Sequence, residues 1–195
     1  MSSEFDFEVL DLGLIGYQRG FSLQQDLVNE IASGKRKGVL IFCEHSPVIT
    51  LGRGAKKENV LTSGERLKSL GIEVVAVNRG GDVTLHLPGQ LVVYPLFDLR
   101  YLGRDIGLFL RNMEKAVISL LNDYRIKATA LEGSTGVWVE QKKIASIGIA
   151  VKNWVAYHGV SLNISCDLDL FSLIRPCGQD IIMTSMARFL SPDLL

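Results

Sequence analysis

The chain has 195 residues, 47% hydrophobic and 22% charged, a composition typical of a folded globular domain and not of a disordered chain. Lys plus Arg and Asp plus Glu both number 21, so the formal net charge of +0 creates no field that favours nucleic acid or anionic lipid. The first residues are acidic and lack the apolar core of a signal peptide, and no apolar run approaches the ~20 residues of a membrane span. We therefore expect one cytoplasmic domain over residues 1–195, with no nucleic-acid or membrane partner.

The three cysteines, Cys43, Cys166 and Cys177, are widely spaced. Their odd number and spacing argue against a disulfide framework and against a zinc site. The chain also lacks the glycine-rich fingerprints of dinucleotide and nucleoside triphosphate sites, because Gly52-Arg53-Gly54 is too short for either. We therefore expect no metal and no cofactor.

Hydrophobic periodicity predicts the elements in chain order. Strands are expected at residues 7–12, 39–43, 47–52, 72–77, 91–94, 128–130, 136–139, 144–151 and 155–164, and helices at residues 16–33, 62–70, 105–124 and 184–190. The third helix is the clearest, because its apolar residues recur at helical spacing from Ile106 to Leu121. Thr62 and Glu65 fit a capping box at the start of the second. Because strands outnumber helices and short turns join several of them, we expect an α+β fold with a mixed, mainly antiparallel sheet flanked by helices.

The stretch from Arg79 to Pro95 joins a glycine pair to a strand. Gly80 and Gly81 let the backbone adopt positive φ and approach a ligand closely, and Arg79 and His86 bracket the turn. One loop therefore carries a fixed cation and a polar ring. For the short Arg-Gly-Gly element alone an ordinary hairpin is the better interpretation, but the whole string is much more specific.

A charged turn at residues 140–143 separates two apolar strands. Lys142 is expected to point to solvent, whereas Lys143 begins the second strand and points inward with Ala145 and Ile147 by period-two alternation. Burial lowers the pKa of a lysine, so such a residue can accept a proton from a neighbour. If it stays charged, it can instead stabilise a neighbouring anion.

Cys177 lies in a Pro-Cys-Gly turn, whereas Cys43 lies inside an apolar strand. A bent loop suits a nucleophile that substrate must reach, and a nucleophilic thiol needs a cation or a base nearby. Lys143 could supply either, but 34 positions separate the two residues, so spacing does not bring them together. Taken by themselves, both residues fit ordinary structural roles better.

Five motifs are spread over nearly the full chain, from about Tyr17 to Gly178. They occupy residues 44–52, 79–95, 136–148, 157–163 and 176–178, and they read EHSPVITLG, RGGDVTLHLPGQLVVYP, GVW with KIASIG, YHGVSLN, and PCG. Together they resemble the octanoyltransferase, or lipoyl synthesis B, branch of the lipoate and biotin protein ligase superfamily. The resemblance implies the α+β fold of the ligase catalytic domains.

The resemblance also implies a reaction and its participants. Members of that family transfer an octanoyl group from octanoyl-acyl carrier protein to a lysine amine on lipoyl domains of 2-oxoacid dehydrogenase complexes and on the glycine cleavage H protein. By carry-over, Cys177 forms an acyl-thioester and Lys143 lowers the pKa of its thiol. The residues carried over to the acyl-substrate site are Arg79, Gly80, Gly81, Asp82, Val83, Thr84, Leu85, His86, Ser146, Ile147, Gly148, Gly159, Val160 and Ser161.

Two positions depart from the family pattern, and both concern the acyl tunnel. Leu85 stands where an aromatic residue is usual, and Leu87 stands where Gly is common. These changes put the acyl chain-length preference in question more than the type of reaction.

Two further expectations concern the surroundings of the nucleophile. Backbone N–H groups at the Gly178 turn or in the glycine loop are expected to stabilise the oxyanion. The generally acidic carriers are expected to be recognised by a basic cluster at the tunnel mouth, formed by Arg53, Lys56, Lys57 and above all Arg79.

Three other functions remain compatible with the sequence. An ATP-dependent lipoate ligase on the same fold would need no cysteine, so Cys177 counts against it. A cysteine hydrolase would use Cys177 with His45, His86 or His158, all of which are expected in polar turns. A non-catalytic protein that binds a carrier domain would use the cysteines only as core residues.

Overall fold

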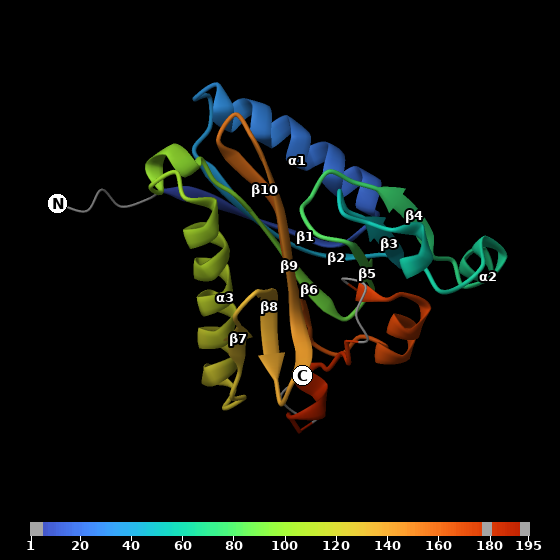
Figure 1. The fold of residues 1–195 in the computed structure, drawn as a ribbon. Coiled ribbons are helices and arrows are strands. Elements are labelled where there is room, and N and C mark those ends of the chain that lie inside the picture. The colour runs from blue at the N-terminus through green and yellow to red at the C-terminus, as the bar shows by residue number, and fades with distance from the viewer. Residues whose placement is uncertain (1–5, 177–180, 192–195) are drawn as a thin grey trace.

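The computed structural model describes residues 6–176 and 181–191, and within these it contains two β-sheets (Figure 1). The larger sheet has seven strands in the order β1-β2-β6-β10-β9-β8-β7, and the smaller has three in the order β4-β3-β5. The strands are β1 (Phe7–Ile15), β2 (Gly38–His45), β3 (Val48–Leu51), β4 (Glu73–Ala76), β5 (Val83–His86), β6 (Gln90–Leu96), β7 (Thr129–Leu131), β8 (Ser134–Val139), β9 (Lys142–Lys152) and β10 (Val155–Asn163). Two neighbouring pairs, β1 with β2 and β3 with β4, are parallel and the other pairs are antiparallel, so the expected mixed, mainly antiparallel α+β fold is confirmed.

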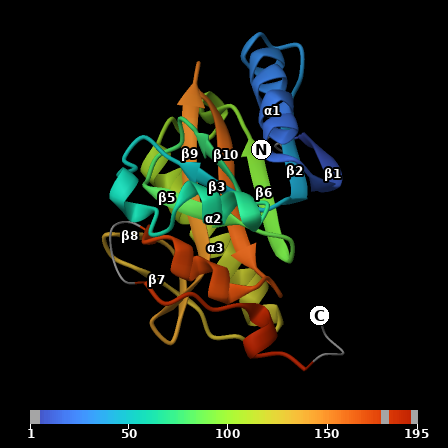
Figure 2. The same cartoon turned by 90° about the vertical axis from the view of Figure 1, so that its right-hand side faces the viewer.

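Two long helices cover opposite faces of the larger sheet (Figure 2). The α-helices are α1 (Tyr17–Ala32), α2 (Gly64–Ser69) and α3 (Ile106–Asp123). The alternation of β6 separates the two faces, because Val92 packs in the cluster beneath α1 and Val93 packs in the cluster beneath α3. Both helices are amphipathic, so tertiary burial of their apolar faces supplies most of their stability. In the described residues no helix has both the length and the apolar character needed to cross a membrane.

The smaller sheet lies over the face of the larger sheet that α1 also covers. Alternate β5 residues point in opposite directions. Thr84 and His86 face Val92 across a cavity, whereas Leu85 packs in a core with Ile49. Short 3-10 helices complete the fold at Lys57–Asn59, Leu99–Tyr101, Leu168–Leu173 and Met186–Arg188. The functional cavity is therefore enclosed between the two sheets.

Close approach of β6 and β10 depends on Gly159. A Cβ atom at this position would lie 2.1 Å from the Val93 carbonyl oxygen and 2.8 Å from Pro95 Cδ. The preceding residue, His158, has φ of +58°, and its N–H leaves the sheet to donate to the Gln24 side chain at 2.8 Å. This local distortion turns the β10 backbone toward α1 beside the cavity.

Three local predictions were wrong. The expected helix at residues 184–190 is only one 3-10 turn, because the preceding tail instead pairs with β9. Lys143 N–H donates to the Ile182 carbonyl at 2.8 Å, and Thr184 N–H donates to the Lys143 carbonyl at 2.9 Å. The second wrong prediction is the N-cap of α2. It is Ser63 and not Thr62, because the Ser63 hydroxyl accepts the Arg66 N–H.

The third wrong prediction concerns the end of strand β2, where His45 lies. The turn expected between the strands at residues 39–43 and 47–52 is displaced, since β2 continues through His45 before the chain turns into β3. The alternation of β2 buries His45 on the same face as Cys43. The polar residues around His45 do not indicate this burial.

Candidate functional site

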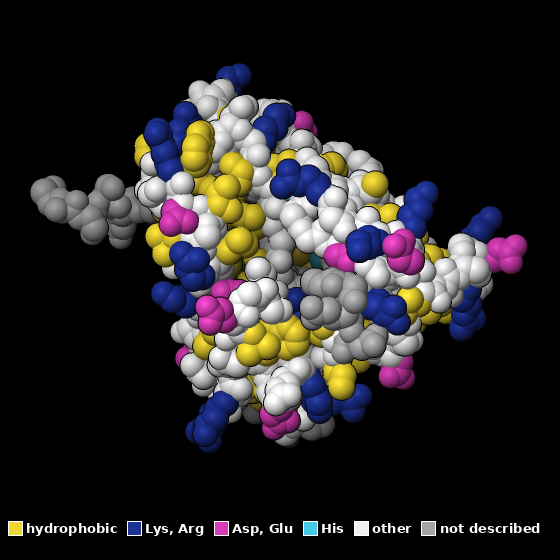
Figure 3. All heavy atoms as spheres, in the orientation of Figure 1, with side chains coloured by type: hydrophobic (Ala, Val, Ile, Leu, Met, Phe, Trp, Pro, Cys, Tyr) yellow, Lys and Arg dark blue, Asp and Glu magenta, His cyan; other side chains and the backbone are white. Residues whose placement is uncertain are grey.

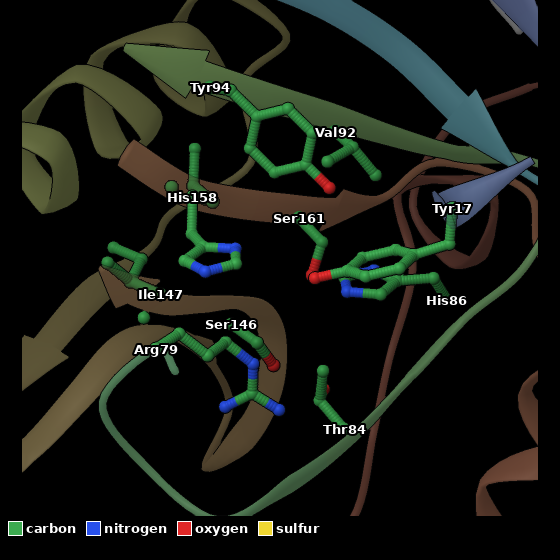
Figure 4. A pocket seen from close by; sticks show the side chains of 13 residues that line it. Tyr17, Arg79, Thr84, His86, Val92, Tyr94, Ser146, Ile147, His158 and Ser161 are labelled. Atoms are coloured by element: carbon green, nitrogen blue, oxygen red, sulfur yellow. The ribbon is translucent and has the colours of Figure 1, made fainter. Parts of the chain in front are cut away.

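A small cavity of about 40 Å³ lies between the two sheets and the N-terminus of α1 (Figure 4). Its walls come from α1, the loop after β4, and strands β5, β6, β9 and β10. The lining residues are Tyr17, Arg79, Thr84, His86, Val92, Tyr94, Ser146, Ile147, Gly148, His158, Gly159, Val160 and Ser161.

The structure brings together the three segments that the sequence marked as a substrate site. The glycine loop crosses β9, where Gly80 N–H donates to the Ile149 carbonyl at 2.8 Å. A Cβ on Gly148 would lie 3.0 Å from the Gly80 carbonyl oxygen, so small residues on both sides permit the contact. Gly159 is opposite Gly148 in the β9–β10 ladder, which places residues 146–148 and 159–161 on neighbouring strands.

Arg79 points into the molecule instead of into solvent. Its side chain is buried, and Nη2 donates to the Thr50 carbonyl and hydroxyl oxygens, each at 2.9 Å, while Nη1 donates to the Gly80 carbonyl at 3.0 Å. These bonds anchor the glycine loop to β3 and leave a fixed positive charge at the cavity wall. The expectation that Arg79 contributes to a surface patch for acidic carriers was therefore wrong.

Several residues carried over to the substrate site lie beside the cavity without lining it. Leu85 and Leu87 pack in the apolar core that α2 covers, so the two departures from the family pattern fall outside the walls of this cavity. The Asp82 carboxylate organises the loop by accepting the Val83 N–H at 2.7 Å and the Lys56 N–H at 3.3 Å.

All three histidines are buried in strands, and the expectation that they occupy polar turns was wrong. Burial lowers the pKa of His45 and His86, and it lowers the pKa of His158 to about 3, with the Arg79 charge contributing. The three imidazoles are therefore neutral at physiological pH. The local sequence misled at His45 and His86 because the prolines and glycine that follow them form turns only beyond the strand, whereas Gly159, next to His158, lies inside β10.

Hydrogen bonds define the orientation of two of these rings. His45 Nδ1 faces the Ile15 carbonyl at 2.9 Å and so must be its donor, which leaves Nε2 to accept the Tyr94 hydroxyl at 2.7 Å. His86 Nδ1 likewise faces Oε1 of the Gln90 side chain at 3.2 Å. The cavity therefore has rigid polar walls held in one arrangement.

Tyr17, Val92 and Tyr94 line the cavity but were missed from the sequence. Tyr17 is at the first turn of α1 and stacks near His86, with ring centroids 6.1 Å apart. Burial raises the pKa of its hydroxyl to about 12, so it is a neutral hydrogen-bonding group. Its apolar spacing predicts only a core residue, because no local signal shows that α1 begins beside the cavity.

A wider cleft of about 470 Å³ adjoins this cavity, and Lys143 lines it. Both spaces share Arg79, Thr84 and residues 146–148, and the cleft adds Thr135 and Pro176. A histidine is visible within the hollow near the centre of Figure 3, with Lys and Arg side chains on the surrounding surface. The inner cavity and the outer cleft are therefore neighbours that share part of their walls.

Lys143 is buried at 4% exposure and Lys142 is exposed, which confirms the inward orientation expected from alternation. The ammonium Nζ donates to the Thr135 carbonyl at 2.9 Å and lies 5.3 Å from the centroid of the Trp138 ring. An ammonium over an aromatic face is stabilised by the ring quadrupole.

Cys177 and Gly178 lie outside the described residues. The chain on either side of this segment is near Lys143, because Pro176 lines the same cleft and Met183 bridges to Lys143. Cys43 and Cys166 are buried, and burial raises the pKa of their thiols to about 12 and about 11. In the described residues no group of three or more His, Cys, Asp and Glu is placed to hold a metal ion.

Comparison with known proteins decides the family. Residues 16–194 match the lipoyl protein ligase A/B catalytic domain. The octanoyltransferase of Syntrophotalea carbinolica is 46% identical over 182 residues, which cover 93% of this chain and 83% of that protein. The chain belongs to the octanoyltransferase family. Another member, from Solibacter usitatus, is 46% identical over 176 residues, covering 90% of this chain and 80% of its own.

Solved structures show the octanoyltransferase chain to have the lipoate protein ligase fold. Lipoate-protein ligase A bound with ATP has a TM-score of 0.75 at 19% identity, covering 96% of this chain and 80% of that chain. A T. acidophilum protein solved with bound lipoic acid has a TM-score of 0.74 at 20% identity, with the same coverage of 96% and 80%. At this identity the likeness concerns the fold, whereas the octanoyltransferase relatives distinguish the family from the ligases.

Proposed function

We propose that octanoyl transfer, the activity of this family, proceeds in this chain through a thioester on Cys177. The position of Lys143 supports this proposal most directly. Lys143 is buried and lines the outer cleft. Pro176 and Met183, which flank the Cys177 segment in the chain, both lie near it. A cation beside a thiol lowers the pKa of that thiol and raises its thiolate fraction.

The reaction divides into two acyl transfers. The Cys177 thiolate attacks the carbonyl carbon of the octanoyl thioester, and the carrier thiolate leaves and takes up a proton. The neutral amine of the acceptor lysine then attacks the Cys177 thioester, forms an amide and loses a proton, and the Cys177 thiolate leaves. Lys143 stabilises the thiolate at the beginning and at the end.

The inner cavity, together with the adjoining outer cleft, is proposed to hold the octanoyl chain. Val92, Ile147 and Val160 supply apolar wall, and the Tyr94–His45 pair closes one side. Each buried methylene contributes about 0.8 kcal/mol, so a chain that fills the cavity binds better than a shorter one. Because Leu85 lies in the core, this cavity wall and not Leu85 is proposed to set chain length.

The glycine loop is a weaker candidate for the oxyanion site than the sequence suggested. The Gly80 N–H is directed at the Ile149 carbonyl at 2.8 Å, which counts against this amide as a donor to substrate. The Gly178 turn, outside the described residues, stays a prediction for that role.

The proposed donor is octanoyl-acyl carrier protein, and the proposed acceptors are lipoyl domains of 2-oxoacid dehydrogenase complexes and the glycine cleavage H protein. Arg53 is exposed and lines the outer cleft, and Lys56 and Lys57 are exposed nearby in sequence. These cations are proposed to attract acidic carriers to the mouth of the outer cleft. One cytoplasmic catalytic domain over residues 1–195 stays part of the proposal.

Intact-protein mass spectrometry tests the proposal. After mixing with octanoyl-acyl carrier protein in the absence of ATP, the wild type is expected to gain one octanoyl group, and Cys177→Ser none. Peptide mapping should place the group on Cys177, and a lipoyl domain should then remove it. Transfer that persists in Cys177→Ser, or that requires ATP and free octanoic acid, would overturn the thioester route.

A further inference from the structure

One peptide unit joins Lys143 to helix α3. The Lys143 ammonium donates to the Thr135 carbonyl oxygen at 2.9 Å, and the N–H of the same peptide unit, that of Gly136, donates to the Glu114 carboxylate at 3.0 Å. The carbonyl and N–H of a trans peptide are coplanar and point in opposite directions. The peptide therefore has an anion at its donor end and a cation at its acceptor end.

The path of the Lys143 side chain depends on the orientation of this peptide. Gly136 has φ of +132°, and a Cβ there would lie 2.5 Å from Lys143 Cε and 2.7 Å from the Ala145 carbonyl oxygen. The aliphatic stem of Lys143 thus packs directly on the Gly136 backbone. Rotation of the peptide would both remove the acceptor from the ammonium and disturb the surface beneath the stem.

Glu114 is suitably placed to hold that orientation. It is half-buried on α3, four residues after Leu110, which lines the outer cleft, so both lie on the same face of the helix. A hydrogen bond from an N–H to a carboxylate is charge-assisted and stronger than a neutral one. Linked hydrogen bonds polarise each other, so the carboxylate also makes the Thr135 carbonyl a better acceptor for the ammonium.

We propose that Glu114 is a positioning residue for Lys143, acting through the Thr135–Gly136 peptide. The inference rests on the proposed function, in which Lys143 lowers the pKa of the Cys177 thiol. Glu114 keeps the ammonium in place so that its charge acts on the thiol in both acyl transfers. Loss of Glu114 then affects the chemistry without affecting carrier binding.

The test measures the rate of Cys177 alkylation by iodoacetamide against pH, with the product mapped by mass, together with kcat and KM for octanoyl transfer. Glu114→Ala is expected to shift the alkylation profile upward by about one pH unit and to lower kcat about tenfold at neutral pH, with KM for the carrier unchanged. Glu114→Gln keeps an acceptor oxygen, so its alkylation profile and its kcat should both be close to those of the wild type. The exposed Asp123, on the same helix, provides the matched control Asp123→Ala, which should behave as wild type.

Lys143→Ala separates this inference from the proposed function. If Lys143→Ala shifts the profile and Glu114→Ala does not, the positioning role is wrong while the proposed function stands. If Lys143→Ala leaves the profile unchanged, both are wrong. In the double variant Glu114→Ala should add no further shift, and an additive shift would show that Glu114 acts independently of Lys143. Thermal melting checks folding, and if Glu114→Ala does not fold, Glu114→Asp, one methylene shorter, takes its place with the same expectation.

Discussion

Arg79 and Thr50 are joined by three hydrogen bonds. Arg79 Nη2 donates to the carbonyl and the hydroxyl oxygen of Thr50, each at 2.9 Å, and Arg79 Nε donates to the same hydroxyl at 3.3 Å. This pair ties the glycine loop to the smaller sheet and brings a positive charge to the cavity wall. A surface arginine would have neither function. The loop is therefore a built part of the cavity and not a flexible lid.

Arg79→Lys is expected to destabilise the protein and to impair binding of the acyl donor. Lys keeps the charge but lacks the planar fork that satisfies both Thr50 oxygens, and a buried polar group left unsatisfied costs about 1–3 kcal/mol. Urea unfolding and KM for octanoyl-acyl carrier protein provide the measurements. The exposed Arg53→Lys is the control for stability, and equal stabilities of the two variants would contradict the buried role of Arg79.

His158 makes stability depend on pH. Its pKa in the folded protein is about 3, below the ordinary value of 6.5, so the unfolded chain binds the extra proton first. Stability is therefore fully present above pH 6.5 and is lost as pH falls toward 3, with a slope of up to about 1.4 kcal/mol per pH unit from this residue.

His158→Asn should reduce that slope. Asn does not titrate, and it tolerates the positive φ of this position better than most residues. Urea unfolding of both proteins at pH 7 and at pH 5 measures the difference. His45 and His86 shift in the same direction, so the variant keeps part of the pH dependence, and an unaltered slope would argue against a neutral His158 in the fold.

Gly159→Ala is expected to damage the fold severely. Its Cβ would lie 2.1 Å from the Val93 carbonyl oxygen, so β6 and β10 must separate at the wall of the cavity. Overpacking of this kind costs about 1–3 kcal/mol or more. Gly64→Ala is the matched control, because a Cβ there meets nothing within 4 Å and should leave stability unchanged or raise it. Thermal melting compares them, and equal melting temperatures would show that the strands adapt freely.

Cys43 and Cys166 are expected to be inert in the folded protein. Burial raises the pKa of their thiols to about 12 and about 11, so neither forms thiolate at neutral pH. Iodoacetamide at pH 7.5 should modify Cys177 alone, and the other two only after denaturation. Cys166→Ala should retain full octanoyl transfer, and rapid labelling of Cys166 in the native protein would contradict its burial.

Electrostatic attraction of carriers predicts a salt-dependent reaction. In Arg53→Glu/Lys57→Glu the value of kcat/KM for octanoyl-acyl carrier protein should fall, and in the wild type it should fall as ionic strength rises. The effect should appear in KM more than in kcat, because steering precedes chemistry. Reversal of the charge of the exposed Lys35, which follows the C-terminal end of α1, is the control. Insensitivity to both salt and charge reversal would exclude recognition by these residues.

Local patterns in the sequence determined several features correctly. The apolar spacing in α3 and the alternation along β9 depend only on neighbouring residues, so both the helix and the inward Lys143 could be predicted. The glycine pair after Arg79 likewise indicated close backbone approach, and the structure shows it against β9.

Only tertiary structure decided which residues meet. The Tyr17 ring lies near His86 because α1 begins beside β5, and Glu114 reaches Gly136 because α3 packs on β8. Burial of Arg79 and of the three histidines also depends on sheets that cover them from distant parts of the chain. Side-chain periodicity reports one face of one element, whereas contacts between elements follow from packing of the whole chain, which no local spacing contains.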